Sequence, residues 1–291
     1  MKSKKWLQLL LIAAFIMAFW QYRLYDARHT DREAPQIEIN NTQLLQLSVQ
    51  DSKSVLLQGV SALDEQDGDL TDKVVVEGMQ LIDDSGLIEV SYAVADKSGN
   101  VAKATREAQY TDYDSPKFSL REPLIYEEHE TFDIMTVISA MDVLDGDIQH
   151  RIRATTLTED AISSVGTHRL YFQVTNSIGD TVELIVPLEM LESDRFEAEL
   201  TLTDYLIYLP VGADFQAQKY LNEFLNRSET ISLRDGLSED FSVSISSDVS
   251  TSTEGVYTVT YKVTYTVRNE QNSDYDQKFT GYSRLIVVVE G

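Results

Sequence analysis

The sequence of 291 residues contains no cysteine. Disulfides, thiolate-bound zinc, iron–sulfur clusters, thiol catalysis and lipidated cysteine are therefore excluded. Tryptophan and proline are scarce, with 2 and 5 residues. Basic side chains are outnumbered by 48 acidic ones to 24, which leaves a net charge of −24. Such a chain is poorly suited to nucleic acid or an anionic leaflet, because lysine and arginine must neutralise the phosphates there.

The sequence also lacks the short motifs of common catalytic sites. It contains neither the G-x-S-x-G turn of hydrolases nor the G-x-x-x-x-G-K loop that binds phosphate. Its 4 histidines are widely separated along the chain, so no local zinc-binding pair is present. We therefore expect no enzymatic activity and predict no catalytic residues.

The N-terminal 33 residues differ from the rest of the chain in charge. They carry six basic and three acidic side chains, a net charge of +3. Lysines precede an apolar run from Trp6 to Trp20, in which Gln8 is the one polar residue. Positive charge followed by an apolar run is typical of an export segment whose N-terminal side stays in the cytoplasm. The sequence therefore predicts a single-pass protein of the cell membrane with most of the chain extracytoplasmic.

The residues after the apolar run bear on whether the segment is retained. Signal cleavage needs small side chains at positions −3 and −1, but residues 19–23 are bulky throughout. A helix of this length spans only ~25 Å of a ~30 Å hydrocarbon core, and snorkelling lysines with interfacial aromatic rings can cover the difference. We predict a cytoplasmic tail and transmembrane signal-anchor over 1–20 and a linker over 21–34. A cleaved signal peptide and a buried core helix are the alternatives.

Beyond Ala34 the sequence has the pattern of β-strands. Short runs rich in valine, isoleucine, threonine and tyrosine alternate with polar residues. The pattern also repeats, since D-E-Q-D-G-D-L at 64–70 returns as D-V-L-D-G-D-I at 142–148. Each repeat has room for about seven strands, and alternation means that two sheets must cover each other. The predicted fold is all-β, with three tandem immunoglobulin-like sandwiches after one N-terminal transmembrane helix.

One strand in each repeat sets the predicted register. It follows a glycine and carries apolar side chains at every second position (Gly86, Gly166 and Gly255). Because strand side chains alternate between faces, Tyr92, Phe172 and Tyr261 should point into three separate cores. The third repeat is divergent and rich in tyrosine, and its spacing predicts a helical stretch between 213 and 226.

The repeats resemble a known family. D-x-x-D-G-D-L-T, then a glycine, then V-S-Y-A-V-A-D-K-S-G-N-V-A-K-A-T-R is similar to the bacterial Ig-like repeat named after a pesticidal crystal protein, a relative of hyalin-type repeats. Residues 35–110 carry the pattern well, 116–190 carry it with Asn176 in place of the usual aspartate, and 196–291 share only the central strand. The resemblance implies sandwich domains in tandem on a bacterial surface, and it implies no catalytic residues.

These features predict Ig-like domains at 35–113, 114–193 and 195–291. We expect a membrane-anchored, non-catalytic stalk that presents a module for binding a protein or the cell envelope. The alternative is a carbohydrate-binding accessory module of a surface polysaccharide system. The partner is thus a surface protein or a glycan, and the divergent third domain is the first place to look for it. The sequence makes no prediction of oligomeric state.

Acidic turns are the candidate metal sites. The first two repeats each hold three aspartates in one turn (Asp64, Asp67 and Asp69; Asp142, Asp145 and Asp147). Clustered carboxylates repel, and Ca²⁺ with its preference for oxygen ligands would relieve the repulsion. The other interpretation is a structural Asp-Gly turn, in which aspartate bonds its own backbone and glycine takes a positive φ. Without an EF-hand glutamate, any calcium site should be weak, and we expect no other cofactor. Asp96, in the hairpin turn 96–100, is a further candidate ligand.

Overall fold

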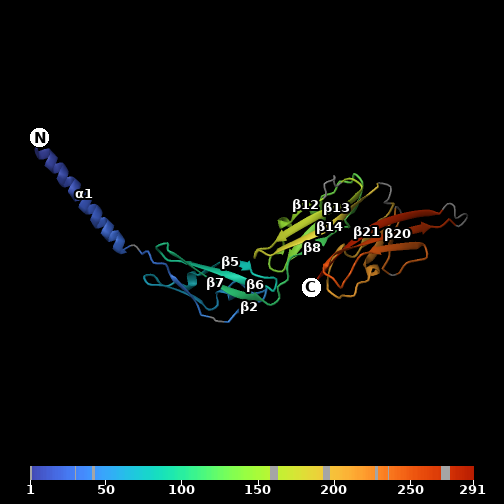
Figure 1. Cartoon of the computed structure of the whole chain (residues 1–291), viewed down its shortest axis with the longest axis horizontal. Helices are drawn as coiled ribbons and strands as arrows, with labels where there is room; N and C mark the ends of the chain where they lie inside the picture. Colours follow the sequence, from blue (N-terminus) through green and yellow to red (C-terminus); the bar gives the residue numbers. More distant parts are fainter. Residues whose placement is uncertain are drawn as a thin grey trace. The chain divides into compact units, whose positions relative to one another are not determined.

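The computed structural model describes residues 2–29, 31–40, 43–157, 163–192, 197–226, 229–234, 236–269 and 276–291. Within the N-terminal helix, it describes the side chains of Trp6 and of residues 11–23. The chain forms two compact units, Met1–Tyr113 and Asp114–Gly291. The first contains a helix and one pair of sheets, and the second contains two pairs of sheets (Figure 1).

Helix α1, Lys2–His29, opens the first unit and is drawn in dark blue in Figure 1. Among the described residues, no helix combines the length and the apolar character needed to cross a membrane. Part of the predicted apolar segment, the side chains of residues 7–10, lies outside the described residues. The segment 21–34, expected as a linker, is helical as far as His29.

The rest of the first unit is a two-sheet sandwich. One sheet has the order β1-β3-β4 (Gln36–Ile39, Val60–Asp64 and Gly68–Asp69). The other has the order β2-β7-β6-β5 (Leu45–Leu47, Val101–Tyr110, Leu87–Ala95 and Val75–Leu81). Strand β2 pairs in parallel with β7, and the remaining pairs are antiparallel.

The second sandwich follows the same plan. Its smaller sheet has the order β11-β10-β8 (Gly146–Asp147, Ile138–Asp142 and Lys117–Leu120). Its larger sheet has the order β12-β13-β14-β9 (Arg153–Thr156, Gly166–Thr175, Thr181–Leu191 and Ile125–Glu127). Strand β9 joins β14 in parallel, as β2 joins β7. A single helical turn, α2 (Ile134–Val137), precedes β10.

The third sandwich repeats the plan once more. Its smaller sheet has the order β15-β17-β18 (Glu199–Leu202, Leu221–Leu225 and Thr230–Ser232). Its larger sheet has the order β16-β21-β20-β19 (Leu206–Pro210, Gln277–Glu290, Gly255–Val267 and Phe241–Ser247). Strand β16 pairs in parallel with β21. The prediction of all-β, Ig-like sandwiches is confirmed.

The predicted register of the central strands is also confirmed. Tyr92, Phe172 and Tyr261 each have 0% of their surface exposed. The phenol of Tyr92 donates a hydrogen bond of 2.6 Å to the carbonyl of Leu56, and the phenol of Tyr261 donates one of 2.8 Å to the carbonyl of Ala217. Both carbonyls belong to short 3₁₀ turns, so the first and third sandwiches fix a helical turn on the core in the same way.

The helix predicted between 213 and 226 is wrong. This segment forms a 3₁₀ turn, Ala217–Tyr220, followed by strand β17. Strand β17 pairs with β15 across an irregularity that leaves Asn222 as an extra residue. Leu221 and Phe224 therefore both face the core although they are three positions apart. The β-bulge places two core side chains three positions apart, a spacing that is also typical of a helix.

Phe172 and Tyr261 lie in separate cores, as predicted, but the cores of the second and third sandwiches adjoin. Leu206 and Ile286 of the third sandwich pack into the core of the second. Their neighbours on β21, Leu285 and Val287, fill the third core instead. Strand β21 is therefore buried on both faces here, which accounts for an apolar run without alternation.

Polar contacts reinforce this junction inside the second unit. The buried guanidinium of Arg284 lies 3.0 Å from the carboxylate of Glu189. The backbone N–H of Phe118 donates to the hydroxyl of Tyr208 at 2.9 Å. These contacts add polar partners to the apolar packing between the second and third sandwiches.

Candidate cation site

Asp64 and Asp142 build the acidic turns in the same way. Asp64 accepts hydrogen bonds from the backbone N–H groups of the residues two and three positions later, at 2.9 and 2.8 Å. Asp142 accepts the equivalent pair at the same two distances. Gly68 and Gly146 take positive φ angles of 75° and 70°, which a residue with a Cβ rarely adopts. Both turns therefore have the geometry of a structural Asp-Gly turn.

Asp67 and Asp145 join the acidic turn to the hairpin turn that follows the central strand. Asp67 accepts from the backbone N–H of Lys97 at 2.7 Å and pairs with its ammonium group at 2.8 Å. Asp145 accepts from the N–H of Ser177 at 2.7 Å and pairs with Arg151 at 2.5 Å. The hydrogen bonds from Lys97 lower the pKa of Asp67. Burial raises the pKa of Asp145, but these hydrogen bonds outweigh it, so the net shift is downward.

Asp69 and Asp147 lie at the surface, just before short helical turns. Asp69 accepts from the N–H of Thr71 at 2.9 Å, and Asp147 accepts from the N–H of Gln149 at the same distance. Hydrogen bonding to Thr71 lowers the pKa of Asp69. All six candidate aspartates therefore accept hydrogen bonds within their own sandwich.

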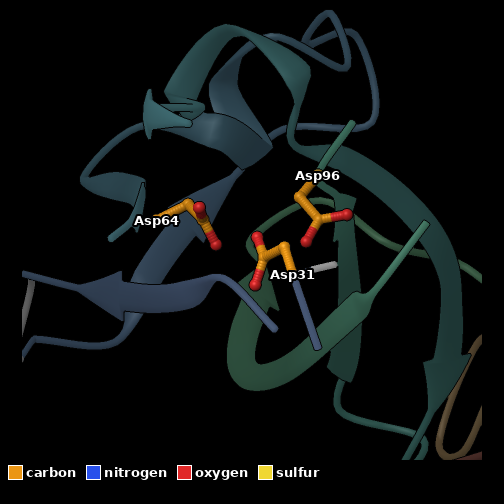
Figure 2. Close-up of side chains that lie close together, drawn as sticks. All are labelled: Asp31, Asp64 and Asp96. Atoms are coloured by element: carbon orange, nitrogen blue, oxygen red, sulfur yellow. The ribbon is translucent and has the colours of Figure 1, made fainter. Parts of the chain in front are cut away.

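The structure brings Asp64 together with two other aspartates. Carboxylate oxygens of Asp31, Asp64 and Asp96 lie within 4.8 Å of one another. The three residues are 7%, 5% and 7% exposed. Figure 2 shows their side chains turned toward one another. This is the group that offers converging oxygen ligands for a metal ion.

Strand pairing explains why these residues meet. Strand β1 runs antiparallel to β3 with Gln36 opposite Leu63, so the chain just before β1 passes the end of β3, where Asp64 lies. Asp96 follows directly on the central strand β6. The sequence identified Asp64 and Asp96, but it missed Asp31, which was assigned to the linker. The only signal for Asp31 was its position a few residues before the first strand.

The hydrogen bonds of the group come mainly from its own loops. Asp96 accepts from the backbone and side-chain amides of Asn100 at 2.8 and 2.7 Å. Burial raises the pKa of Asp96, but these hydrogen bonds lower it further than burial raises it. Asn100 also donates to the carbonyl of Asp31 at 3.3 Å. Among the described residues, no lysine, arginine or histidine forms an ion pair with the three carboxylates.

The second sandwich has an amide at the equivalent place. Asn176 donates from its side-chain nitrogen to Asp142 at 3.0 Å. Its side-chain oxygen accepts from the backbone N–H groups of Ile178 and Asp180 at 3.1 and 2.9 Å. One amide therefore satisfies both the neighbouring carboxylate and the turn. The candidate aspartates of the second turn, Asp142 included, thus have partners within their own sandwich.

The fold and these turns can now be compared with known proteins. Residues 45–109 match the model of the family described as "Bacterial surface protein, Ig-like domain". The chain is also similar to the pesticidal crystal protein Cry22Aa of Bacillus thuringiensis, with 26% identity over 238 residues and 79% of this chain covered. It spans 31% of the length of that relative. The resemblance to the bacterial Ig-like surface repeat is confirmed.

Solved structures show more remote similarity. A Clostridium perfringens ZmpB structure, titled as CBM51-2 in complex with GlcNAc and INT domains, has 14% identity and a TM-score of 0.22. It aligns over 88% of this chain and 42% of that one. Mouse cadherin-23 EC22-24 has 10% identity and a TM-score of 0.21, over 89% of this chain and 99% of that one.

Proposed function

We propose that this chain is a non-catalytic bacterial surface protein, anchored by its N-terminal segment, whose Ig-like sandwiches form a stalk that presents a protein- or envelope-binding module. The family match of residues 45–109 carries the proposal, because it assigns the domain type to bacterial surface proteins. The repetition of the same sheet plan in all three sandwiches supports the role of a stalk.

The sequence of the N-terminal segment supports the anchor. Lysines precede the apolar run, and no small-x-small cleavage site follows it. The side chains of residues 11–20 are all exposed and all apolar, which suits contact with lipid. An anchor of this kind would leave all three sandwiches outside the cytoplasm.

Fractionation of bacteria that produce the full chain tests this proposal. We expect the chain in the membrane fraction, with the sandwiches open to protease added to intact cells. Ile12→Asp places a charge in the apolar run and should release the chain from the membrane. Ile82→Asp, at a residue 50% exposed in the first sandwich, is the matched control and should not. A mature N-terminus between Gln21 and Glu33 would contradict the anchor.

The carbohydrate-binding alternative has less support. It drew on the tyrosines of the third repeat, which can stack against sugar rings when exposed. Tyr261 is fully buried, and Tyr257 and Tyr265 pack against the third core. Tyr265 also stacks on Phe241 with ring centroids 4.7 Å apart. These rings hold the sandwich together and do not form an open platform.

We also propose that Asp31, Asp64 and Asp96 bind a divalent cation, with Ca²⁺ the favoured ion. The observation in favour is the convergence of three nearly buried carboxylates without a basic partner in the described structure. A bound cation would fasten the segment after α1 to the ends of β3 and β6. Extracellular calcium modules bind in the ~0.1–1 mM range, and we expect the same here.

Isothermal titration of the full chain with CaCl₂ tests the cation site. We expect one weak site that is lost in Asp31→Asn, since this change removes charge but keeps the hydrogen-bond acceptor for Glu33. Asp69→Asn is the matched control, because it also removes one aspartate charge from the first sandwich. The proposal fails if the two variants bind calcium equally well.

A further inference from the structure

The second unit contains a groove between its two sandwiches. Its volume is about 820 Å³. One wall comes from the second sandwich around strand β9, and the other from the third sandwich around β15 and β21. Clefts at the junction of two domains are common ligand sites. The two sandwiches pack against each other at this junction, and the groove lies beside that contact.

The groove is strongly acidic. Five glutamates and one arginine line it (Glu122, Glu127, Glu130, Glu197, Glu199 and Arg121). The whole chain has two acidic residues for each basic one, so the groove exceeds the general acidity of the protein. In the part of the chain that the structure describes, none of the five glutamates forms an ion pair with a basic side chain.

Two of these glutamates differ from the others in their hydrogen bonds. Glu122 accepts from the phenol of Tyr126 at 3.0 Å, Glu130 accepts from a backbone N–H at 3.1 Å, and Glu197 accepts from the N–H of Thr280 at 3.2 Å. The side chains of Glu127 and Glu199 make no hydrogen bond among the described residues. Their carboxylates, one on each wall, are open to a cationic partner.

Tyrosines also line the groove, and the negative charge of its glutamates contributes to the raised pKa values of two of them. Burial raises the pKa of Tyr126, and the charges of Glu122 and Glu130 add to the shift. Burial likewise raises the pKa of Tyr205, and Glu199 contributes to the shift. Tyr205 packs against both cores, so its place in the groove is fixed. Tyrosine rings also attract ammonium and guanidinium groups through their faces.

We propose that this groove binds an extended peptide segment rich in lysine and arginine. Unpaired glutamates on both walls complement such a segment, and tyrosine rings favour guanidinium groups over simple cations. The inference rests on the proposed function as a surface binding protein and names the chemistry of its partner.

Fluorescence anisotropy of a labelled octa-arginine peptide with the full chain tests the proposal. At about 0.15 M NaCl, where long-range charge attraction is screened, we expect saturable binding. The double variant Glu127→Gln/Glu199→Gln should weaken it about tenfold. The matched control is Glu89→Gln/Glu107→Gln, which removes two exposed glutamates that face each other across β6 and β7. This control should weaken binding by less than about twofold.

Equal weakening by the two double variants would overturn the proposal, because binding would then follow net charge alone. The absence of measurable binding to the unaltered chain would overturn it as well. Neither result would affect the surface location, which the protease experiment tests separately.

Discussion

The first and second sandwiches carry the same acidic turn and use it differently. In both, one aspartate closes the turn, a second ties it to the hairpin turn, and a third precedes a helical turn. They differ where the hairpin turn meets the first of these aspartates. Asp96 stands there in the first sandwich and faces Asp64, whereas Asn176 stands there in the second and donates to Asp142.

This difference shows how a buried carboxylate can be stabilised in two ways. In the second sandwich the side-chain amide of Asn176 donates a hydrogen bond to Asp142 directly, so Asp142 needs no bound ion. In the first sandwich three carboxylates converge. Hydrogen bonds from Asn100 stabilise the charge of Asp96, and a bound cation would relieve the repulsion among the three. The hairpin turn of the first sandwich begins with Asp96 and ends with Asn100. The equivalent turn of the second begins with Asn176 and ends with Asp180, so the acid and the amide have exchanged places. Three carboxylates thus converge in the first sandwich, whereas Asn176 makes the second turn self-sufficient.

The largest expected effect breaks the second sandwich and leaves the first intact. Phe172→Ala removes a fully buried ring and should cost about 3–5 kcal/mol through lost burial and a residual cavity. Because Leu206 and Ile286 of the third sandwich pack into the core of the second, we expect the two sandwiches to lose stability together in calorimetry. The first sandwich, in the other compact unit, should keep its own transition.

Tyr171→Ala is the control for this change, since Tyr171 lies on the opposite face of the same strand and bonds Glu183. It should cost less than about 1 kcal/mol. If the third sandwich of Phe172→Ala still melted at its original temperature, the packing between the second and third sandwiches would not couple their stabilities.

The next largest effect is expected from a substitution that gives the acidic site of the second sandwich the aspartate of the first. Asn176→Asp removes the donor to Asp142 and puts two carboxylates side by side. The second unit should lose about 2–3 kcal/mol in chelator, because a buried acceptor is left without its donor beside a like charge. Chemical denaturation of the full chain measures the loss. Asp147→Asn, at an exposed position in the same turn, should change stability by about 0.5 kcal/mol or less. Equal stability of both variants would contradict the role given to the amide.

A smaller effect concerns pH and the residues that join the two turns. The folded pKa values of Asp67 and Asp145 lie below the ordinary 3.8. The unfolded chain therefore takes up protons first as pH falls, so this contribution is complete above the ordinary pKa and is lost as pH falls below it. Asp145→Asn should cost about 1 kcal/mol at pH 7 and flatten the loss of stability below pH 4. Unfolding curves at several pH values would show an unchanged slope if Asp145 is not involved.

Much of the fold followed from the sequence because alternation and repetition are local signals. The glycine before each central strand placed Tyr92, Phe172 and Tyr261 in the core without any structure. The packing of the third sandwich against the second was not predicted, although the run from Leu285 to Val289 held its signal. Five consecutive apolar residues cannot all face one core, so such a strand must be buried on both faces.

The candidate site was harder to predict, because its members come from three separate segments. Asp64 and Asp96 belong to recognisable turns, but Asp31 reaches them only through the pairing of β1 with β3. The partners of Asp67 and Asp145 also lie in another turn, about thirty residues later. Spacing within one turn indicated a cluster, whereas only the sheet register determined which carboxylates meet.

The melting temperature of the first sandwich in Asp96→Asn, with calcium and with chelator, tests the central claim most directly. For a Kd of ~0.5 mM, calcium at about 5 mM adds about 1.4 kcal/mol and raises the melting temperature of the unaltered chain by several degrees. Asp96→Asn copies the amide of the second sandwich, so it should raise the melting temperature in chelator and abolish the calcium response. A variant that kept the calcium response, or melted lower than the unaltered chain in chelator, would contradict the account.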